Sequence, residues 1–172
     1  MLSKLFDDVR REELPRWKLF FLCTIYIVCS WVVANFTFLW IDKSLGLHHV
    51  FYGPLSEEFF KIIFLFFIFN GEKINLRFAF IYSLAFASFE QLVAIWVLFN
   101  ELAELAIAMT EPWYYTVIGL VLGFSVTFFV RAIAHCIYTF FEFKVINLTQ
   151  SYYVGLFVGF TLHLLANKFL LG

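Results

Sequence analysis

The chain has 172 residues, of which 63% are hydrophobic and only 15% are charged, and its formal net charge is −1. Soluble domains are typically about 45–50% apolar and about 25% charged, so this composition excludes an ordinary soluble domain. A chain close to neutral also lacks the basic surface that a nucleic-acid partner requires. The length allows a single domain.

The first 16 residues are charged and amphipathic, and we expect them to form a cytoplasmic segment ahead of a membrane domain of residues 17–172. Five apolar stretches follow, each near the length of about 20 residues that a transmembrane helix needs. The predicted fold is therefore all-α, a polytopic transmembrane helical bundle of about five spans. The predicted spans are Trp17–Ile41, Leu45–Phe69, Phe78–Phe99, Trp113–Phe141 and Tyr152–Leu171.

Glycine and proline mark particular points along these spans. Pro54 removes a backbone donor and should kink the second span or start a new helix. Two pairs of glycines four residues apart, Gly119 with Gly123 and Gly155 with Gly159, should let the last two spans pack closely within the chain.

The distribution of Lys and Arg between the loops predicts the orientation, because cytoplasmic loops carry an excess of them. A cytoplasmic N-terminus places most of the basic loop residues on that side and leaves only Lys43 and Lys168 on the other. We therefore expect the N-terminus in the cytoplasm.

Ionisable side chains lie inside the predicted spans, where each charge costs at least about 2.5–3.5 kcal/mol on insertion scales. Residues four apart share one face of a helix, so these side chains form one polar stripe on each of four helices. We expect the stripes to face a shared polar intramembrane cavity, which favours a functional site. The residues are Glu57, Glu58, Lys61, Glu90, Arg131, His135, Thr139, His163 and Asn167.

Position along the predicted spans supports this expectation for three of the acidic and histidine residues and differs for a fourth. Glu57, Glu90 and His163 fall near the middles of their predicted spans. His135 lies about six residues from the centre of residues 117–141, a depth difference of roughly 9 Å at 1.5 Å per residue.

Three kinds of chemistry use such a set of residues. A buried Glu can activate water as a general base, while His and Asn stabilise the oxyanion that forms. A second possibility is a divalent metal such as zinc, with Glu57, Glu90, His135 and His163 as the candidate ligands, although no HExxH motif is present. A third is a pathway for protons or ions.

Four motifs occur in order along the chain: PLSEEFFK from Pro54, FASFE from Phe86, RAIAHCIYT from Arg131 and HLLAN from His163. Together they resemble the PrsW family of intramembrane proteases, which is related to the CAAX prenyl protease and bacteriocin-processing (CPBP) family. CPBP proteins carry EExxxR, and a His at the position of Glu90, so this chain is more similar to PrsW. It departs from the family at Gln91, where Asn is common.

The resemblance implies an intramembrane endopeptidase of a prokaryotic cytoplasmic membrane, which hydrolyses a peptide bond of a membrane-anchored protein with a Glu-activated water. Family members are described both as metalloproteases and as metal-independent glutamate proteases. The absence of HExxH favours no metal, and the sequence leaves both open. The implied catalytic residues are Glu57 as general base, Glu58 assisting it, Glu90 and His135 at the water or metal, and His163 with Asn167 at the oxyanion; Lys61, Arg131 and Thr139 would support them.

Two other functions remain. A non-catalytic membrane scaffold would keep the family fold and bind a partner in the bilayer. A small proton-coupled transporter would use the buried ionisable residues, although the chain shows no inverted repeat of the kind common in transporters. Some charges also have a purely structural interpretation, since Glu58 and Lys61 can neutralise each other.

Overall fold

The computed structural model describes residues 2–45, 49–105 and 113–168, which form six α-helices and contain no strand. The all-helical class predicted from the sequence is therefore confirmed for this part of the chain. In chain order the helices are α1 (Leu2–Arg10), α2 (Arg16–Leu45), α3 (His49–Phe69), α4 (Leu76–Leu105), α5 (Trp113–Thr149) and α6 (Tyr152–Ala166).

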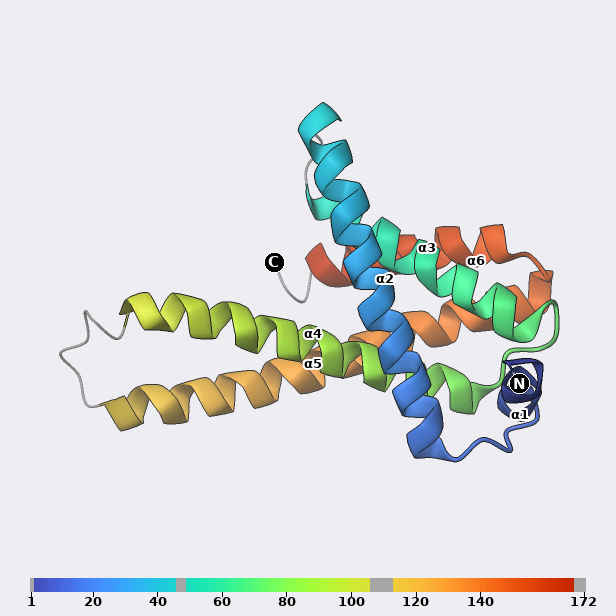
Figure 1. The fold of residues 1–172 in the computed structure, drawn as a ribbon, viewed down its shortest axis with the longest axis horizontal. Helices are drawn as coiled ribbons and strands as arrows, with labels where there is room; N and C mark the ends of the chain where they lie inside the picture. The colour runs from blue at the N-terminus through green and yellow to red at the C-terminus, as the bar shows by residue number, and fades with distance from the viewer. Residues whose placement is uncertain (1, 46–48, 106–112, 169–172) are drawn as a thin grey trace.

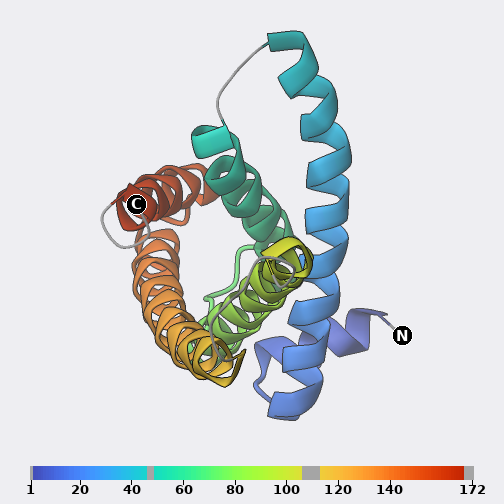
Figure 2. The same ribbon diagram turned by 90° about the vertical axis from the view of Figure 1, so that its left-hand side faces the viewer.

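Helices α3, α6, α5 and α4 follow one another around an incomplete ring, which is seen from its end in Figure 2. Helix α2 packs against both α3 and α4 and so covers the side of the ring between them. It crosses the other helices at a steep angle, whereas α4 and α5 run side by side as a long hairpin (Figure 1). The ring places one face of each of four helices toward the others.

Two helices extend beyond their predicted ends. Helix α4 continues past Phe99 to Leu105, through part of the segment expected to be a connector, and α5 continues past Phe141 to Thr149. In the part of α5 that the structure describes, the segment long and apolar enough to cross a membrane runs from Ser125 to Thr149, and His135 lies near the middle of that range.

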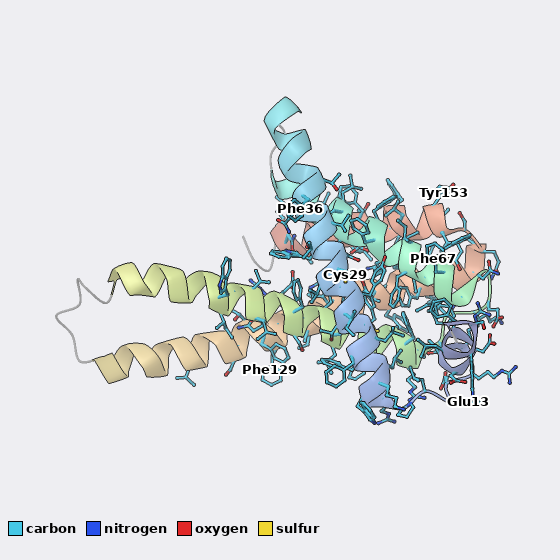
Figure 3. The ribbon with its side chains drawn as sticks, viewed as in Figure 1. Glu13, Cys29, Phe36, Phe67, Phe129 and Tyr153 are labelled. Atoms are coloured by element: carbon cyan, nitrogen blue, oxygen red, sulfur yellow. The ribbon has the colours of Figure 1, made fainter. Side chains whose placement is uncertain are left out.

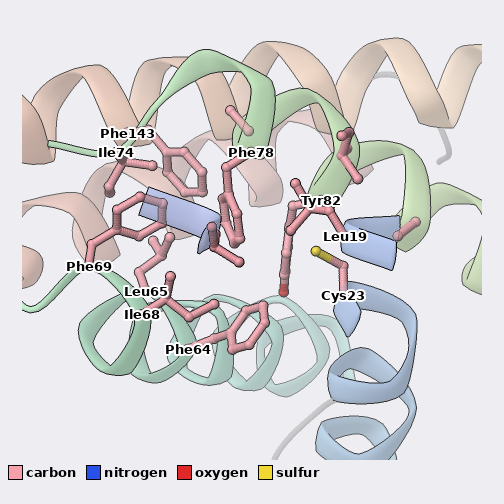
Figure 4. Packing of buried hydrophobic residues seen from close by; sticks show 14 of the residues in the cluster. Leu19, Cys23, Phe64, Leu65, Ile68, Phe69, Ile74, Phe78, Tyr82 and Phe143 are labelled. Carbon is pink, nitrogen blue, oxygen red and sulfur yellow. The ribbon is translucent and has the colours of Figure 1, made fainter. Parts of the chain in front are cut away.

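Aromatic side chains form much of the buried core. Phe64, Phe69, Phe78 and Tyr82 pack in a row between α3 and α4 (Figure 4). The ring centroids of Phe69 and Phe78 are 5.1 Å apart at 85°, an edge-to-face contact. Tyr26 of α2 stacks on Phe64 with centroids 3.9 Å apart. Each such pair contributes about 0.5–1.5 kcal/mol beyond the burial of its area, which holds α2 and α4 against α3.

The N-terminal segment closes one end of this core. Helix α1 buries Val9 against it, and the Arg10 side chain donates from Nε to the carbonyl of Ile68 at the end of α3. Arg77 of α4 donates to the carbonyls of Glu12 and Leu14. These bonds satisfy backbone acceptors that helix ends and turns leave unpaired. The predicted amphipathic segment is thus a helix packed on the bundle.

The exterior is strongly apolar. Phe67, Phe129 and Tyr153 point outward, with 62%, 63% and 87% of their surface exposed (Figure 3). Such a surface suits lipid rather than water. In the described ranges, three helical segments are long and apolar enough to cross a membrane: Arg16–Thr37, Leu76–Trp96 and Ser125–Thr149. The protein is therefore an all-helical membrane protein.

The other two predicted spans are helical but differ from these three. Helix α3 has 21 residues and carries Glu57, Glu58 and Lys61, and α6 is an apolar helix of 15 residues from Tyr152 to Ala166. Pro54 lies inside α3, which begins upstream of it at His49, so the proline does not start the helix.

The two glycine pairs behave differently. Gly155 and Gly159 of α6 are in close contact with other helices, as predicted, because a Cβ at either position would lie within 3 Å of a neighbouring side chain. A Cβ at Gly119 or Gly123 would meet no atom within 4 Å in the described part of the chain. The predicted close packing is therefore found at α6 and not at these positions of α5.

Candidate functional site

A buried histidine of α6 faces two adjacent carboxylates of α3. Nδ1 of His163 lies 3.0 Å from Oε1 of Glu58, and its Nε2 lies 3.4 Å from Oε2 of Glu57. Both ring nitrogens of His163 therefore face acidic oxygens. The predicted polar face of α6 does meet the predicted polar face of α3.

A buried lysine connects this pair to a third carboxylate. Nζ of Lys61 bonds to Oε2 of Glu58, and it lies 2.5 Å from Oε2 of Glu142 on α5. All three side chains are at most 3% exposed. Glu58 and Lys61 lie three residues apart on α3, so their pairing agrees with the structural interpretation of these charges. The third member comes from a different helix.

Gly159 makes room for this ion cluster. A Cβ at this position of α6 would lie 2.6 Å from Oε2 of Glu58 and 2.8 Å from Cδ of Glu142. Real Cβ atoms essentially never approach other atoms this closely. The absence of a side chain therefore lets the α6 backbone lie directly against the two carboxylates.

A second acid–histidine pair joins α4 to α5. Nε2 of His135 lies 2.6 Å from Oε2 of Glu90 and 3.1 Å from the hydroxyl of Tyr138. The ring of Phe86 packs on the imidazole with centroids 4.7 Å apart. The Ser83 hydroxyl lies 2.8 Å from the carbonyl of Ala79 on its own helix and 3.2 Å from that of His135, so α4 is close to the same turn of α5. These contacts hold the His135 ring in one orientation.

Aromatic contacts join the two pairs into one cluster. The Tyr138 ring stacks on His163 at 4.8 Å and 14°, and the centroids of His135 and His163 are 5.6 Å apart. Nζ of Lys61 lies 5.1 Å from the centroid of the Tyr138 ring, in range of a cation–π interaction. We call these residues the acid–histidine cluster: Glu57, Glu58, Lys61, Glu90, His135, Tyr138, Glu142 and His163.

Exposure separates the four carboxylates into two kinds. The side chains of Glu57 and Glu90 are 27% and 22% exposed, whereas those of Glu58 and Glu142 are at most 1% exposed. Oε2 of Glu57 is buried, and Nε2 of His163 faces it at 3.4 Å. The two partly exposed acids are therefore the ones that a water molecule or substrate can reach, and the two buried acids hold the lysine.

The remaining predicted residues lie near the cluster with less evident roles. Thr139 is 1% exposed on α5. Arg131 is half-buried one turn before His135, and its buried Nε has no hydrogen-bond partner in the described part of the chain. Asn167 ends α6 one turn after His163, and its backbone N–H bonds to the carbonyls of His163 and Leu164. Nothing in these contacts ties the Asn167 side chain to the carboxylates.

Sequence reasoning missed two members of the cluster, Glu142 and Tyr138, and it predicted close packing at Gly159 without connecting that glycine to the site. A signal for Glu142 was present, because positions 135, 139 and 142 are spaced by four and three residues and share one helical face. The predicted end of the span at Phe141 placed Glu142 outside the membrane. Tyr138 had no such signal, since a tyrosine on an apolar helix is most often part of the packing.

The predicted metal ligands form two separate Glu–His pairs in this structure. Within the described ranges, no three His, Cys, Asp or Glu side chains converge as a metal site. Nε2 of His135 and both ring nitrogens of His163 face carboxylates. Metal dependence therefore stays a prediction to be tested by experiment.

Comparisons of the chain with protein-family models, with curated proteins and with solved structures find no match. The fold and the site define the protein as an all-helical membrane protein with a buried acid–histidine cluster. The resemblance of its four motifs to PrsW-type proteases stays a prediction.

Proposed function

We propose that the protein is an intramembrane endopeptidase. One observation carries the proposal: four helices bring two Glu–His pairs into contact at the centre of an apolar bundle. Buried ionisable groups at membrane depth are costly and are retained chiefly where they serve a function. Pairs of carboxylate and imidazole are the groups that general acid–base catalysis uses most.

Glu57 is the proposed general base. It is one of the two partly exposed acids of the cluster, and its Oε2 lies 3.4 Å from Nε2 of His163. In the proposed reaction the oxygen of a water molecule attacks the carbonyl carbon of the peptide bond. Glu57 takes the proton of that water and passes it to the amine that leaves when the C–N bond breaks.

His163 is the proposed stabiliser of the oxyanion formed in this step. Its Nδ1 is held by Glu58, which in turn is held by Lys61, so the ring has a defined orientation. Asn167 is one helical turn further along and supplies a second donor in the proposal. Glu90 and His135 complete the water site. Glu58, Lys61 and Glu142 act as positioning residues, because they are buried and contact one another.

The proposal includes a topology and a substrate class. The chain crosses a prokaryotic cytoplasmic membrane five times, with α2 to α6 as the spans and the N-terminus in the cytoplasm. The apolar exterior supports insertion in a membrane, and the basic residues near the N-terminus support the orientation. The substrate is a transmembrane or membrane-anchored protein, since the cluster lies among helices whose outer faces are apolar.

The test is a cleavage assay in proteoliposomes with a pool of single-span reporter proteins whose apolar segments vary in sequence. Mass spectrometry detects the fragments. Wild-type protein should release them, and Glu57→Gln should lower the rate at least about 100-fold, the contribution expected of a general base. Glu13→Gln, an exposed acid far from the cluster, should match the wild type. Equal cleavage by Glu57→Gln and wild type, or no fragments from the wild type, would remove the proposal.

A chelator arm of the same assay decides between the two mechanisms. Cleavage that survives 1,10-phenanthroline supports water activation by glutamate alone. Loss of cleavage that is restored by added zinc supports a metal mechanism with Glu57, Glu90, His135 and His163 as ligands. Circular dichroism before and after addition of the chelator shows whether the protein stays folded, so that loss of activity is not mistaken for unfolding.

A second function, a non-catalytic membrane scaffold, is favoured by one observation. Lys61 forms ion pairs with both Glu58 and Glu142, as expected of an ion cluster that only stabilises the fold. A scaffold predicts that Glu57→Gln leaves the cellular phenotype of the protein intact, whereas Gly159→Leu, which would separate α6 from α3 and α5, abolishes it.

A further inference from the structure

A groove on the outer surface lies between α2 and α4, away from the acid–histidine cluster. It has a volume of about 570 Å³. Its apolar walls include Trp17 and Phe20 from α2 and Phe80 and Leu84 from α4, and its lining also contains Arg16 and Arg77. Volumes of about 300–1,000 Å³ are typical of sites that bind a small molecule.

The groove lies at the end of the bundle where α2 and α4 both begin. Figure 1 shows the two helices crossing close to these ends. The lining residues of α4 run from Leu76 to Leu84, so the groove follows that helix for about 12 Å at 1.5 Å per residue. Trp17 is 62% exposed beside it, as tryptophans at the membrane interface commonly are. The groove thus follows the first turns of two helices that are both long and apolar enough to cross a membrane.

Positive charge collects at the mouth of the groove. Arg16 and Arg77 line it, and the ammonium of Lys18 lies over the ring of Trp17 at 5.3 Å. Arg77 donates to two backbone carbonyls, which do not neutralise its charge, and its buried Nε has no partner in the described part of the chain. Neither arginine forms an ion pair with a carboxylate of the described residues, although Glu12 and Glu13 lie nearby in sequence.

We propose that this groove binds an anionic phospholipid, with an acyl chain between α2 and α4 and the phosphate at Arg16 and Arg77. Charge complementarity argues for an anionic over a zwitterionic lipid, and the apolar walls argue for a lipid over a soluble anion. Basic pockets between transmembrane helices bind anionic headgroups by the same combination. Each basic residue near such a surface favours binding about five-fold.

Trp17 provides a local probe. Two variants would each retain one tryptophan, either Trp17 or Trp96, with the others changed to Phe. Trp96 is the matched control, since it is 64% exposed on α4 and lies outside the groove. Each variant is reconstituted in phosphatidylcholine nanodiscs, and fluorescence quenching is measured with brominated phosphatidylglycerol or brominated phosphatidylcholine. Quenching against mole fraction gives the relative affinity at each tryptophan.

At Trp17 we expect brominated phosphatidylglycerol to bind at least about five-fold more tightly than brominated phosphatidylcholine. At Trp96 the two lipids should bind equally well. Arg16→Gln, at an exposed position, should lower the preference at Trp17 about five-fold. Equal quenching of Trp17 by both lipids, or an unchanged preference in Arg16→Gln, would overturn the proposal. So would displacement of the anionic lipid by inorganic phosphate at constant ionic strength, because the site would then bind a soluble anion.

Discussion

Gly159→Ala tests how closely α6 approaches the carboxylates of the acid–histidine cluster. The added methyl group would lie 2.6 Å from Oε2 of Glu58 and 2.8 Å from Cδ of Glu142. For an ordinary contact Oε2 would have to move to at least 3.4 Å. Both neighbours are tied to Lys61, so neither can move without straining or breaking its bond to the ammonium.

The magnitude follows from two opposing effects. Replacing Gly by Ala inside a helix stabilises it by about 0.8–1.0 kcal/mol. Overpacking a buried site costs about 1–3 kcal/mol, and breaking a buried ion pair costs about 3–5 kcal/mol. Because the groups that must move belong to such a pair, we expect Gly159→Ala to lower the free energy of unfolding by about 2–4 kcal/mol.

Gly123→Ala is the matched control. Gly123 also lies inside a helix, α5, but a Cβ there meets no atom within 4 Å among the described residues. Only the helix-forming effect applies, so this substitution should be neutral or stabilise the protein by up to about 1 kcal/mol. The two substitutions are chemically identical, and their difference isolates the contact with the carboxylates.

The assay is equilibrium unfolding in mixed micelles with increasing mole fraction of dodecyl sulfate, followed by far-ultraviolet circular dichroism. Gly159→Ala should unfold at a lower fraction than the wild type, and Gly123→Ala at the same or a higher one. If both variants shift together, or if Gly159→Ala matches the wild type, then α6 does not lie against these carboxylates and the geometry of the cluster is wrong.

Three further variants test other contacts. Lys61→Met leaves two buried carboxylates without their cation and should lower the free energy of unfolding by about 3–5 kcal/mol in the same titration. Adding Glu142→Gln to this variant should recover part of the loss. Wild-type stability of Lys61→Met alone would argue against the bridge. Tyr26→Phe removes the hydroxyl bond to the carbonyl of Phe60 but keeps the ring stacking, so a loss of only about 0.5–1.5 kcal/mol is expected, and a much larger loss would show that the ring is displaced as well. Arg10→Gln removes the bond that holds α1 to the end of α3, and amide hydrogen exchange in residues 2–10 should become faster; unchanged exchange would mean that apolar packing alone holds α1.

The sequence was informative about the site because polar residues on a membrane helix stand out from their surroundings. Glu58 and Lys61 were predicted as a possible pair from their spacing of three, and the structure joins them. His163 and Glu90 were predicted to lie near the middles of their spans. In the structure His163 faces a carboxylate of α3, and Glu90 faces an imidazole of α5. Helical periodicity is a local property, so one sequence suffices to assign residues to faces.

The end of α5 shows why local patterns failed elsewhere. Glu142 and Lys144 follow a long apolar run, and charged residues usually mark the end of a membrane span, so the predicted end was Phe141. In the structure Glu142 is completely buried and pairs with Lys61, a residue 81 positions earlier. A partner for a charge removes much of the cost of burying it, and that partner is invisible to any window of neighbouring residues.

The chain's own sequence determined that it is helical, that it belongs in a membrane, and which face of each helix is polar, because composition and periodicity are written in consecutive residues. Only the tertiary structure decided which acid meets which histidine, that Glu142 completes the lysine bridge, and that Tyr138 stacks on His163 while its hydroxyl reaches His135. Those pairings depend on how far each helix is shifted and rotated against the next. At α6 that packing rests on a missing side chain, Gly159, which lets three helices meet at one buried ammonium group.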